Sequence, residues 1–124
     1  MNVVDSSGWL EYFADGCNAD FFAPAITAEA HLVVPTICIF EVFKPLCIQR
    51  GNEQALQAMG LLYRGQMIPL TDEIALQAAL ISLEYKLPMA DSIILATTHN
   101  QKAILWTQDE HFKDLPGVRY IEKR

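Results

Sequence analysis

Hydrophobic residues form two kinds of pattern that alternate along this chain. Continuous apolar runs of about four to eight residues, bounded by turn-forming residues, are typical of buried strands. Longer stretches in which apolar residues recur roughly every three or four positions are typical of helices. The predicted strands are residues 1–4, 31–34, 67–70, 102–107 and 118–121.

The segments between these strands carry the signals of helix starts and ends. The first predicted helix follows the capping residues Ser6 and Ser7, the second spans 19–30, and the third follows Thr36. The fourth spans 52–63 after a cap at Asn52, the fifth begins at Thr71 or Asp72, and the sixth begins near Asp91.

Two prolines modify this pattern. Pro45 cannot donate a hydrogen bond to the carbonyl of Glu41, and its ring crowds that carbonyl. We therefore expect the helix that holds Glu41 to kink or end nearby. Pro69 cannot donate to a strand ladder, so we expect its strand to lie at the edge of the sheet.

Strands that alternate with helices predict an α/β fold with a central, mostly parallel sheet of about five strands. The chain has 124 residues, without a repeat, a low-complexity tract or a linker. This length is typical of one globular domain, so we expect residues 1–124 to form a single domain.

The composition adds an expectation about partners and location. Hydrophobic residues make up 52% of the chain, which is high for a small domain and predicts an apolar face for self-association or a partner. No apolar stretch is long enough to span a membrane, and no basic, apolar leader follows Met1, so we expect a cytoplasmic protein. The three cysteines are odd in number and lack CxxC spacing, which favours reduced thiols.

Four acidic residues lie where apolar runs give way to turns or helix starts: Asp5, Glu41, Asp91 and Asp109. The carboxyl ends of parallel strands meet at one edge of a sheet, so one cleft can collect all four side chains. Carboxylates at close range stay ionised only if cations compensate them. Oxygen donors without cysteine or histidine at matching positions predict a hard cation, Mg²⁺ or Mn²⁺.

Each acid also has a structural interpretation when it is taken alone. Asp91 and Asp109 are suited to capping helices, and Asp5 is suited to a turn after its strand. Glu41 can belong to an exposed stripe with Lys44. The joint placement of the four acids favours the shared site.

The acids and their neighbours resemble the PIN domain, and more narrowly the VapC-type toxins of bacterial and archaeal toxin-antitoxin pairs. The similarity covers essentially the whole chain, including the order of its elements. It is carried by the segments 3–7, 40–42, 87–97 and 105–112, and by the strand after Pro116 and Gly117.

The resemblance implies a three-layer α/β/α fold and a metal-dependent endoribonuclease that hydrolyses RNA phosphodiester bonds. Asp5, Glu41 and Asp91 match the three nearly invariant acids of the family, and Asp109 matches a more variable fourth. These four residues are the predicted catalytic and metal-binding residues, with Mg²⁺ as the cofactor and Mn²⁺ as a substitute. Small hydroxyl residues that support the family's site are matched by Ser6 and Thr107. The sequence departs from the family at two positions. Pro45 lies only four residues after Glu41, and Ser92 occupies a position where relatives commonly carry alanine.

The resemblance also implies partners: an RNA substrate, a cognate antitoxin protein, and a homodimer or a toxin-antitoxin hetero-oligomer, with no membrane. The net charge of −6 is unusual for a protein that binds nucleic acid. Bound divalent ions would then supply much of the attraction for phosphate. The bases that could line a rim of the site, or equally remain ordinary solvated side chains, are Lys44, Arg50, Arg64, Lys86 and Lys102.

One histidine and two other functional classes bear on this interpretation. His111 follows Asp109 closely and could face the cleft, but a structural role is the more common one for such a residue. A receiver-type phosphoacceptor fits poorly, because Asp5 is followed by Ser6 and Ser7 rather than by a second acid. A catalytically silent PIN-like module that binds RNA or protein is the remaining alternative.

Overall fold

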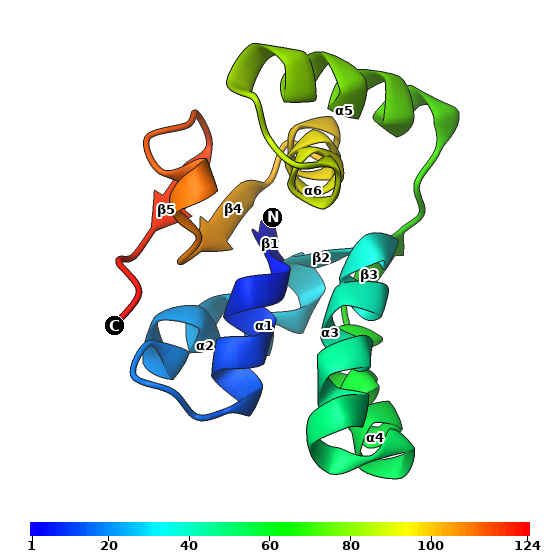
Figure 1. Ribbon diagram of the computed structural model, residues 1–124, viewed down its shortest axis with the longest axis vertical. Helices are drawn as coiled ribbons and strands as arrows, with labels where there is room; N and C mark the ends of the chain where they lie inside the picture. The colour runs from blue at the N-terminus through cyan, green and yellow to red at the C-terminus, as the bar shows by residue number, and fades with distance from the viewer.

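The computed structural model describes all residues from Met1 to Arg124. Its centre is a sheet of five strands, and every neighbouring pair is parallel. The strands are β1 (Asn2–Val4), β2 (Leu32–Pro35), β3 (Gln66–Ile68), β4 (Ile104–Thr107) and β5 (Val118–Tyr120). Helices cover the sheet from two sides, which confirms the predicted three-layer α/β/α class (Figure 1).

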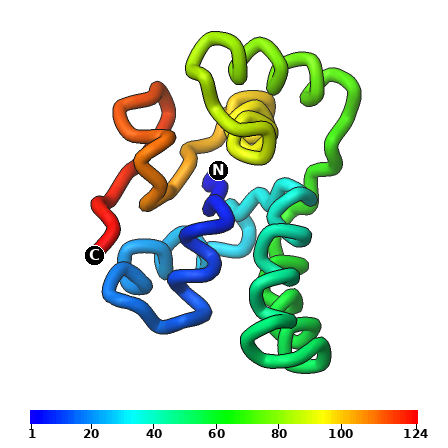
Figure 2. Tube along the Cα trace, in the orientation of Figure 1, coloured from blue at the N-terminus to red at the C-terminus, as the bar shows by residue number.

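Six α-helices and two short 3-10 helices connect the strands. They are α1 (Ser6–Phe13), α2 (Ala19–Thr27), η1 (Glu29–His31), α3 (Thr36–Arg50), α4 (Asn52–Leu62), α5 (Asp72–Tyr85), α6 (Met89–Asn100) and η2 (Glu110–Phe112). In Figure 1, α5 and α6 lie above the sheet, and α1 and α2 lie below it. Figure 2 shows that α3 and α4 form a pair that extends to one side. None of the helices has both the length and the hydropathy needed to cross a membrane.

The strand order is β3-β2-β1-β4-β5. From β1 the chain moves outward through β2 to β3, then returns across the sheet to place β4 on the other side of β1. This reversal makes the boundary between β1 and β4 the switch point of the sheet, where ligands bind in open α/β folds. The two strands are in register at Val4 and Trp106. The residues that follow them therefore emerge side by side.

The central strands are apolar on both faces because both faces are covered. Val3, Val4, Val33, Val34 and Leu105 have no exposed surface. Helix α6 packs against β2 and β4, and its residues from Ser92 to Thr98 are all buried. The start of α6 is thereby held firmly beside the edge of the sheet where β1 and β4 end.

Helix α3 differs from the expectation for Pro45. A kink or an end was expected near Pro45. The end does not occur, because the helix runs from Thr36 to Arg50 with Pro45 inside it. Its buried residues Cys38, Val42 and Leu46 follow one face on both sides of the proline. Burial of this face and packing against α4 outweigh the loss of one backbone hydrogen bond.

Three predicted helix caps also differ. Asp5, not Ser6 or Ser7, caps α1, because its carboxylate accepts a hydrogen bond from the backbone N–H of Gly8. Thr36 and Asn52 are the first residues of α3 and α4, so neither caps its helix. The predicted helix start at Thr71 or Asp72 is confirmed: α5 begins at Asp72, and the hydroxyl of Thr71 caps it by accepting from the N–H of Ile74. The edge position of β3 is confirmed as well, although the strand ends before Pro69.

Gly8 allows the close approach that brings α1 onto its neighbours. A Cβ atom at this position would lie 2.6 Å from the ring of Phe22 and 2.7 Å from Val4, both of which are fully buried. We therefore expect Gly8→Ala to lower the free energy of unfolding by about 1–3 kcal/mol through overpacking. Gly60 is the matched control, because a Cβ there meets nothing within 4 Å and Gly60→Ala should stabilise α4 by roughly 0.5–1 kcal/mol. Urea unfolding of both variants measures the difference, and equal effects would contradict the packing proposed for Gly8.

Candidate metal centre

Asp5 directly follows β1 and is almost completely buried, at 2% exposure. Its Oδ1 accepts hydrogen bonds from the N–H of Gly8 at 2.9 Å and from the hydroxyl of Ser7 at 2.8 Å. Its Oδ2 accepts from the hydroxyl of Thr107 at 2.7 Å. The first turn of α1 and the end of β4 therefore hold this carboxylate in one orientation.

These donors do not compensate the cost of burying the charge. Burial is the largest effect and raises the pKa of Asp5 to about 7. The hydrogen bonds from Thr107, Gly8 and Ser7 oppose this rise, and the nearby charge of Asp109 adds to it. No basic side chain forms an ion pair with Asp5. Within the chain only these hydrogen bonds favour its ionised form, and a cation from outside the chain would stabilise that form further.

Glu41 approaches the same edge of the sheet from α3. Its Oε1 accepts a hydrogen bond of 2.7 Å from the hydroxyl of Ser6, the residue that follows Asp5. This contact ties the second turn of α3 to the first turn of α1, and it leaves Oε2 of Glu41 for a ligand. Pro45 does not prevent this placement.

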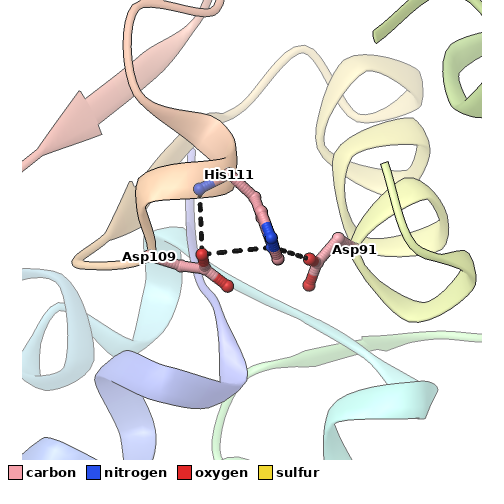
Figure 3. Close-up of side chains that lie close together, drawn as sticks. All are labelled: Asp91, Asp109 and His111. Atoms are coloured by element: carbon pink, nitrogen blue, oxygen red, sulfur yellow. Dashed lines mark hydrogen bonds and ion pairs between the residues drawn. The ribbon is translucent and has the colours of Figure 1, made fainter. Parts of the chain in front are cut away.

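Asp91, Asp109 and His111 form a group of their own, without Asp5 or Glu41, in which the potential ligand atoms lie within 4.8 Å of one another. Asp91 comes from the first turn of α6, and Asp109 caps η2 by accepting from the N–H of His111 at 2.9 Å. The imidazole ring of His111 lies between the two carboxylates (Figure 3). Its Nδ1 is 3.0 Å from Oδ2 of Asp91 and 3.3 Å from Oδ1 of Asp109.

Thr107 links Asp5 to the backbone of Asp109. Its hydroxyl donates to Asp5 and at the same time accepts from the backbone N–H of Asp109, at 2.9 Å. Ser6 makes the corresponding connection between the end of β1 and Glu41. Both hydroxyl residues singled out in the sequence therefore contact a predicted acid or its backbone.

The electrostatic coupling links all four acids. Burial raises the pKa of Asp91, and the charges of Asp109 and Glu41 raise it further, against an opposing effect of His111. Because the charge of Asp109 also raises the pKa of Asp5, each acid is close enough to at least one other to repel it. His111 responds in the opposite sense, since its hydrogen bond to Asp91 and the charge of Asp109 raise its pKa.

The donor set fits a divalent ion. Ligand atoms of Asp91, Asp109 and His111 lie within 4.8 Å of one another. Asp5 and Asp91 both have raised pKa values. Asp5 has no cationic partner, and the only one near Asp91 is the exposed His111. Carboxylate oxygens are the donors that Mg²⁺ and Mn²⁺ prefer. Such a centre can bind a divalent ion and present it to an anionic substrate.

Three polar residues of the centre were missed or given less weight in the sequence. His111 faces the acids, whereas its sequence context favoured a structural role. The signal that could have placed it there is its position two residues after Asp109, an aspartate suited to capping. Gln108 and Lys123 line a polar cleft of about 400 Å³ beside the acids. We name this space the polar cleft; its lining residues are Ser7, Gln108, Asp109, Glu110, His111 and Lys123. Nothing in the sequence indicated that Lys123 would reach it.

Comparisons with known proteins agree with this architecture. The family model described as the PIN domain matches residues 3–118. A toxin-antitoxin complex from Klebsiella pneumoniae superposes with a TM-score of 0.80 at 24% identity, covering 96% of each chain. VapC20 of Mycobacterium tuberculosis, described as a toxin that cleaves the sarcin-ricin loop, gives 0.76 at 14% identity, covering 95% of this chain and 97% of that one. The DNA-bound VapBC complex of Salmonella typhimurium gives 0.74 at 14% identity, over 98% and 97%. No curated protein sequence gives a significant match.

The buried Asp5 predicts how the metal-free protein responds to pH. Its pKa is about 7 in the folded chain, against an ordinary value of 3.8. The unfolded chain loses this proton at lower pH, so the stabilisation present below pH 4 is lost as pH rises towards 7. We expect this group alone to reduce the free energy of unfolding by on the order of 4 kcal/mol across that window.

Asp5→Asn should remove this part of the pH dependence and should be more stable than the wild type at pH 8 without metal. Urea unfolding in a chelator at several pH values measures it. Asp20→Asn, at the exposed start of α2, is the control and should keep the slope of the wild type. An unchanged slope in Asp5→Asn would show that Asp5 is not the buried acid responsible.

Proposed function

The chain belongs to the PIN domain family, and on this basis we propose that it is an endoribonuclease that depends on a divalent ion and acts as the toxin of a toxin-antitoxin pair. One observation carries the proposal. Four carboxylates from distant parts of the chain couple electrostatically at the switch point between β1 and β4, without enough positive charge in the protein to balance them.

We assign the binding of Mg²⁺, or Mn²⁺ in its place, to Asp5, Asp91 and Asp109, with Glu41 as the fourth acid of the site. When bound, such an ion supplies Lewis acidity and charge neutralisation at a scissile phosphate. Ser6 and Thr107 orient the carboxylates of Glu41 and Asp5 through hydrogen bonds of 2.7 Å each. Residues that orient the ligands of a metal in this way usually strengthen its binding.

We propose that water, rather than a side chain, attacks the RNA phosphodiester. The hydroxyls of Ser6, Ser7 and Thr107 all donate to carboxylates of the centre. None of them has a histidine partner that could remove its proton, as a covalent nucleophile would require. Oε2 of Glu41 remains available to accept a proton during hydrolysis.

The polar cleft is the surface on which we propose that the RNA backbone lies. Its lining contains no hydrophobic residue, and Lys123 and His111 are its basic side chains. Neither of the two arginines named as candidate rim residues lines it, since Arg50 donates to the carbonyl of Phe13 and Arg64 pairs with Glu29. With a net charge of −6, the protein relies on bound cations and on Lys123 for phosphate attraction.

The partner of the toxin would be a cognate antitoxin, as in the related complexes from Klebsiella and Salmonella. An apolar face is available for protein contacts on α5 and the start of α6. Leu76, Leu80, Leu83 and Met89 are 68–78% exposed there, beside a largely apolar groove of about 370 Å³ between the two helices. We propose that this face takes part in binding the antitoxin or a second copy of the chain. We also propose that the toxin and its antitoxin are located in the cytoplasm, where the toxin would meet its RNA substrate.

Asp91→Asn tests the proposed activity. We expect the variant to lose both Mn²⁺-induced thermal stabilisation and cleavage of RNA, because a ligand that binds only the folded state must raise its stability. Without metal, the variant should be at least as stable as the wild type. The substitution removes a partly buried, repelled charge, and the ion pair it breaks involves an exposed histidine, which is a weak interaction.

Glu53→Gln is the control for the loss of one negative charge, since Glu53 is exposed at the start of α4. It should keep the metal response and the cleavage of the wild type. If Asp91→Asn bound Mn²⁺ as the wild type does, Asp91 would be a helix-start residue only. If the wild type bound metal but cleaved no RNA, the chain would instead be a catalytically silent PIN-like module.

A further inference from the structure

We propose that Nδ1 of His111 is a ligand of the divalent ion, so that the centre offers a mixed oxygen and nitrogen donor set. The inference rests on the proposed metal site and adds a residue that is not one of the four acids. Its consequence is selectivity: the centre would favour Mn²⁺ and similar transition ions over Mg²⁺ more strongly than four carboxylates would.

The spacing of the donor atoms supports this assignment. Nδ1 of His111 lies 3.0 Å from Oδ2 of Asp91 and 3.3 Å from Oδ1 of Asp109. Neighbouring donors of an octahedral ion with bonds of about 2.1 Å are about 3.0 Å apart. Nδ1 of His111 therefore lies at nearly the spacing of a neighbouring ligand from each carboxylate. All three donor atoms lie within 4.8 Å of one another, and they come from two different elements of the fold (Figure 3).

The backbone that carries the ring is held in place by its neighbours. Phe112, the next residue, has no exposed surface and anchors η2 in the core. The N–H of His111 donates to Asp109, and the N–H of Asp109 donates to Thr107. Because η2 is held at both ends, the backbone that carries the imidazole is fixed beside the two acids, which the ring contacts through Nδ1.

The exposure of the ring is suited to coordination. The side chain of His111 is 57% exposed, and Nδ1 is the nitrogen that faces the acids. With its proton on the other nitrogen, the imidazole presents the lone pair of Nδ1 to an ion between Asp91 and Asp109. Imidazole nitrogen is a softer donor than carboxylate oxygen, which strengthens binding of transition ions more than binding of Mg²⁺.

The distances from Nδ1 of His111 to Asp91 and Asp109 are also typical of hydrogen bonds. In that alternative, a charged His111 would compensate the two carboxylates in place of a metal ion. The two roles make opposite predictions. A histidine that only substitutes for the ion competes with it, so removing the ring should tighten metal binding. A histidine that coordinates the ion contributes to its affinity, so removing the ring should weaken metal binding.

The test uses the full chain loaded with Mn²⁺. Pulsed electron paramagnetic resonance detects the coupling between the Mn²⁺ spin and a directly bonded ¹⁴N nucleus. We expect this coupling in the wild type and in His99→Ala, which removes an exposed histidine at the end of α6. We expect no coupling in His111→Ala or in His111→Gln, which keeps a polar side chain on η2 should the alanine variant fold poorly.

Calorimetric titration with each ion gives the selectivity. In both His111 variants, the affinity for Mn²⁺ should fall at least about tenfold, and the affinity for Mg²⁺ should change much less. Mn²⁺ binding without ¹⁴N coupling in the wild type would overturn the inference and leave the proposed function intact, as would tighter Mn²⁺ binding in His111→Ala. Absence of Mn²⁺ binding in the wild type would overturn both.

Discussion

The carboxylate of Asp5 is buried at the end of β1 with hydrogen-bond donors around it but with no cationic side chain beside it. Burial of this kind costs stability, and the fold increases the cost by placing Asp109 nearby. A divalent ion bound at this edge of the sheet would offset that cost. The repulsion among the acids is therefore the constraint that relates this fold to its chemistry.

The sheet topology explains why the acids meet. Parallel strands end at a common edge, and the reversal of strand order places the ends of β1 and β4 next to each other. The apolar strands and the buried face of α6 anchor the backbone on both sides. Hydrogen bonds from the hydroxyls of Ser6 and Thr107 then orient the carboxylates of Glu41 and Asp5. The proposed binding residues thus come from a few positions at the ends of elements whose remaining residues form the core.

Much of the fold was predictable because its signals are local. Apolar runs of strand length and helical periodicity predicted the five strands and their positions along the chain, and an acid after such a run predicted a site at the sheet edge. What could not be predicted depends on distant contacts. Helix α3 continues through Pro45 because its buried face extends past the proline and the helix packs against α4. His111 lies beside Asp91 on a backbone that is anchored by the buried Phe112. Lys123 reaches the polar cleft only through the path of the chain after β5.

The central claim is that these acids form one site for a divalent ion. Diffraction from a crystal grown with Mn²⁺, measured where manganese scatters anomalously, tests it most directly. We expect an anomalous peak within bonding distance, about 2.0–2.4 Å, of carboxylate oxygens from both sides of the switch point, those of Asp5 and those of Asp91 or Asp109. A crystal in which manganese is absent from this edge of the sheet, or lies only at acids elsewhere on the surface, would contradict the claim.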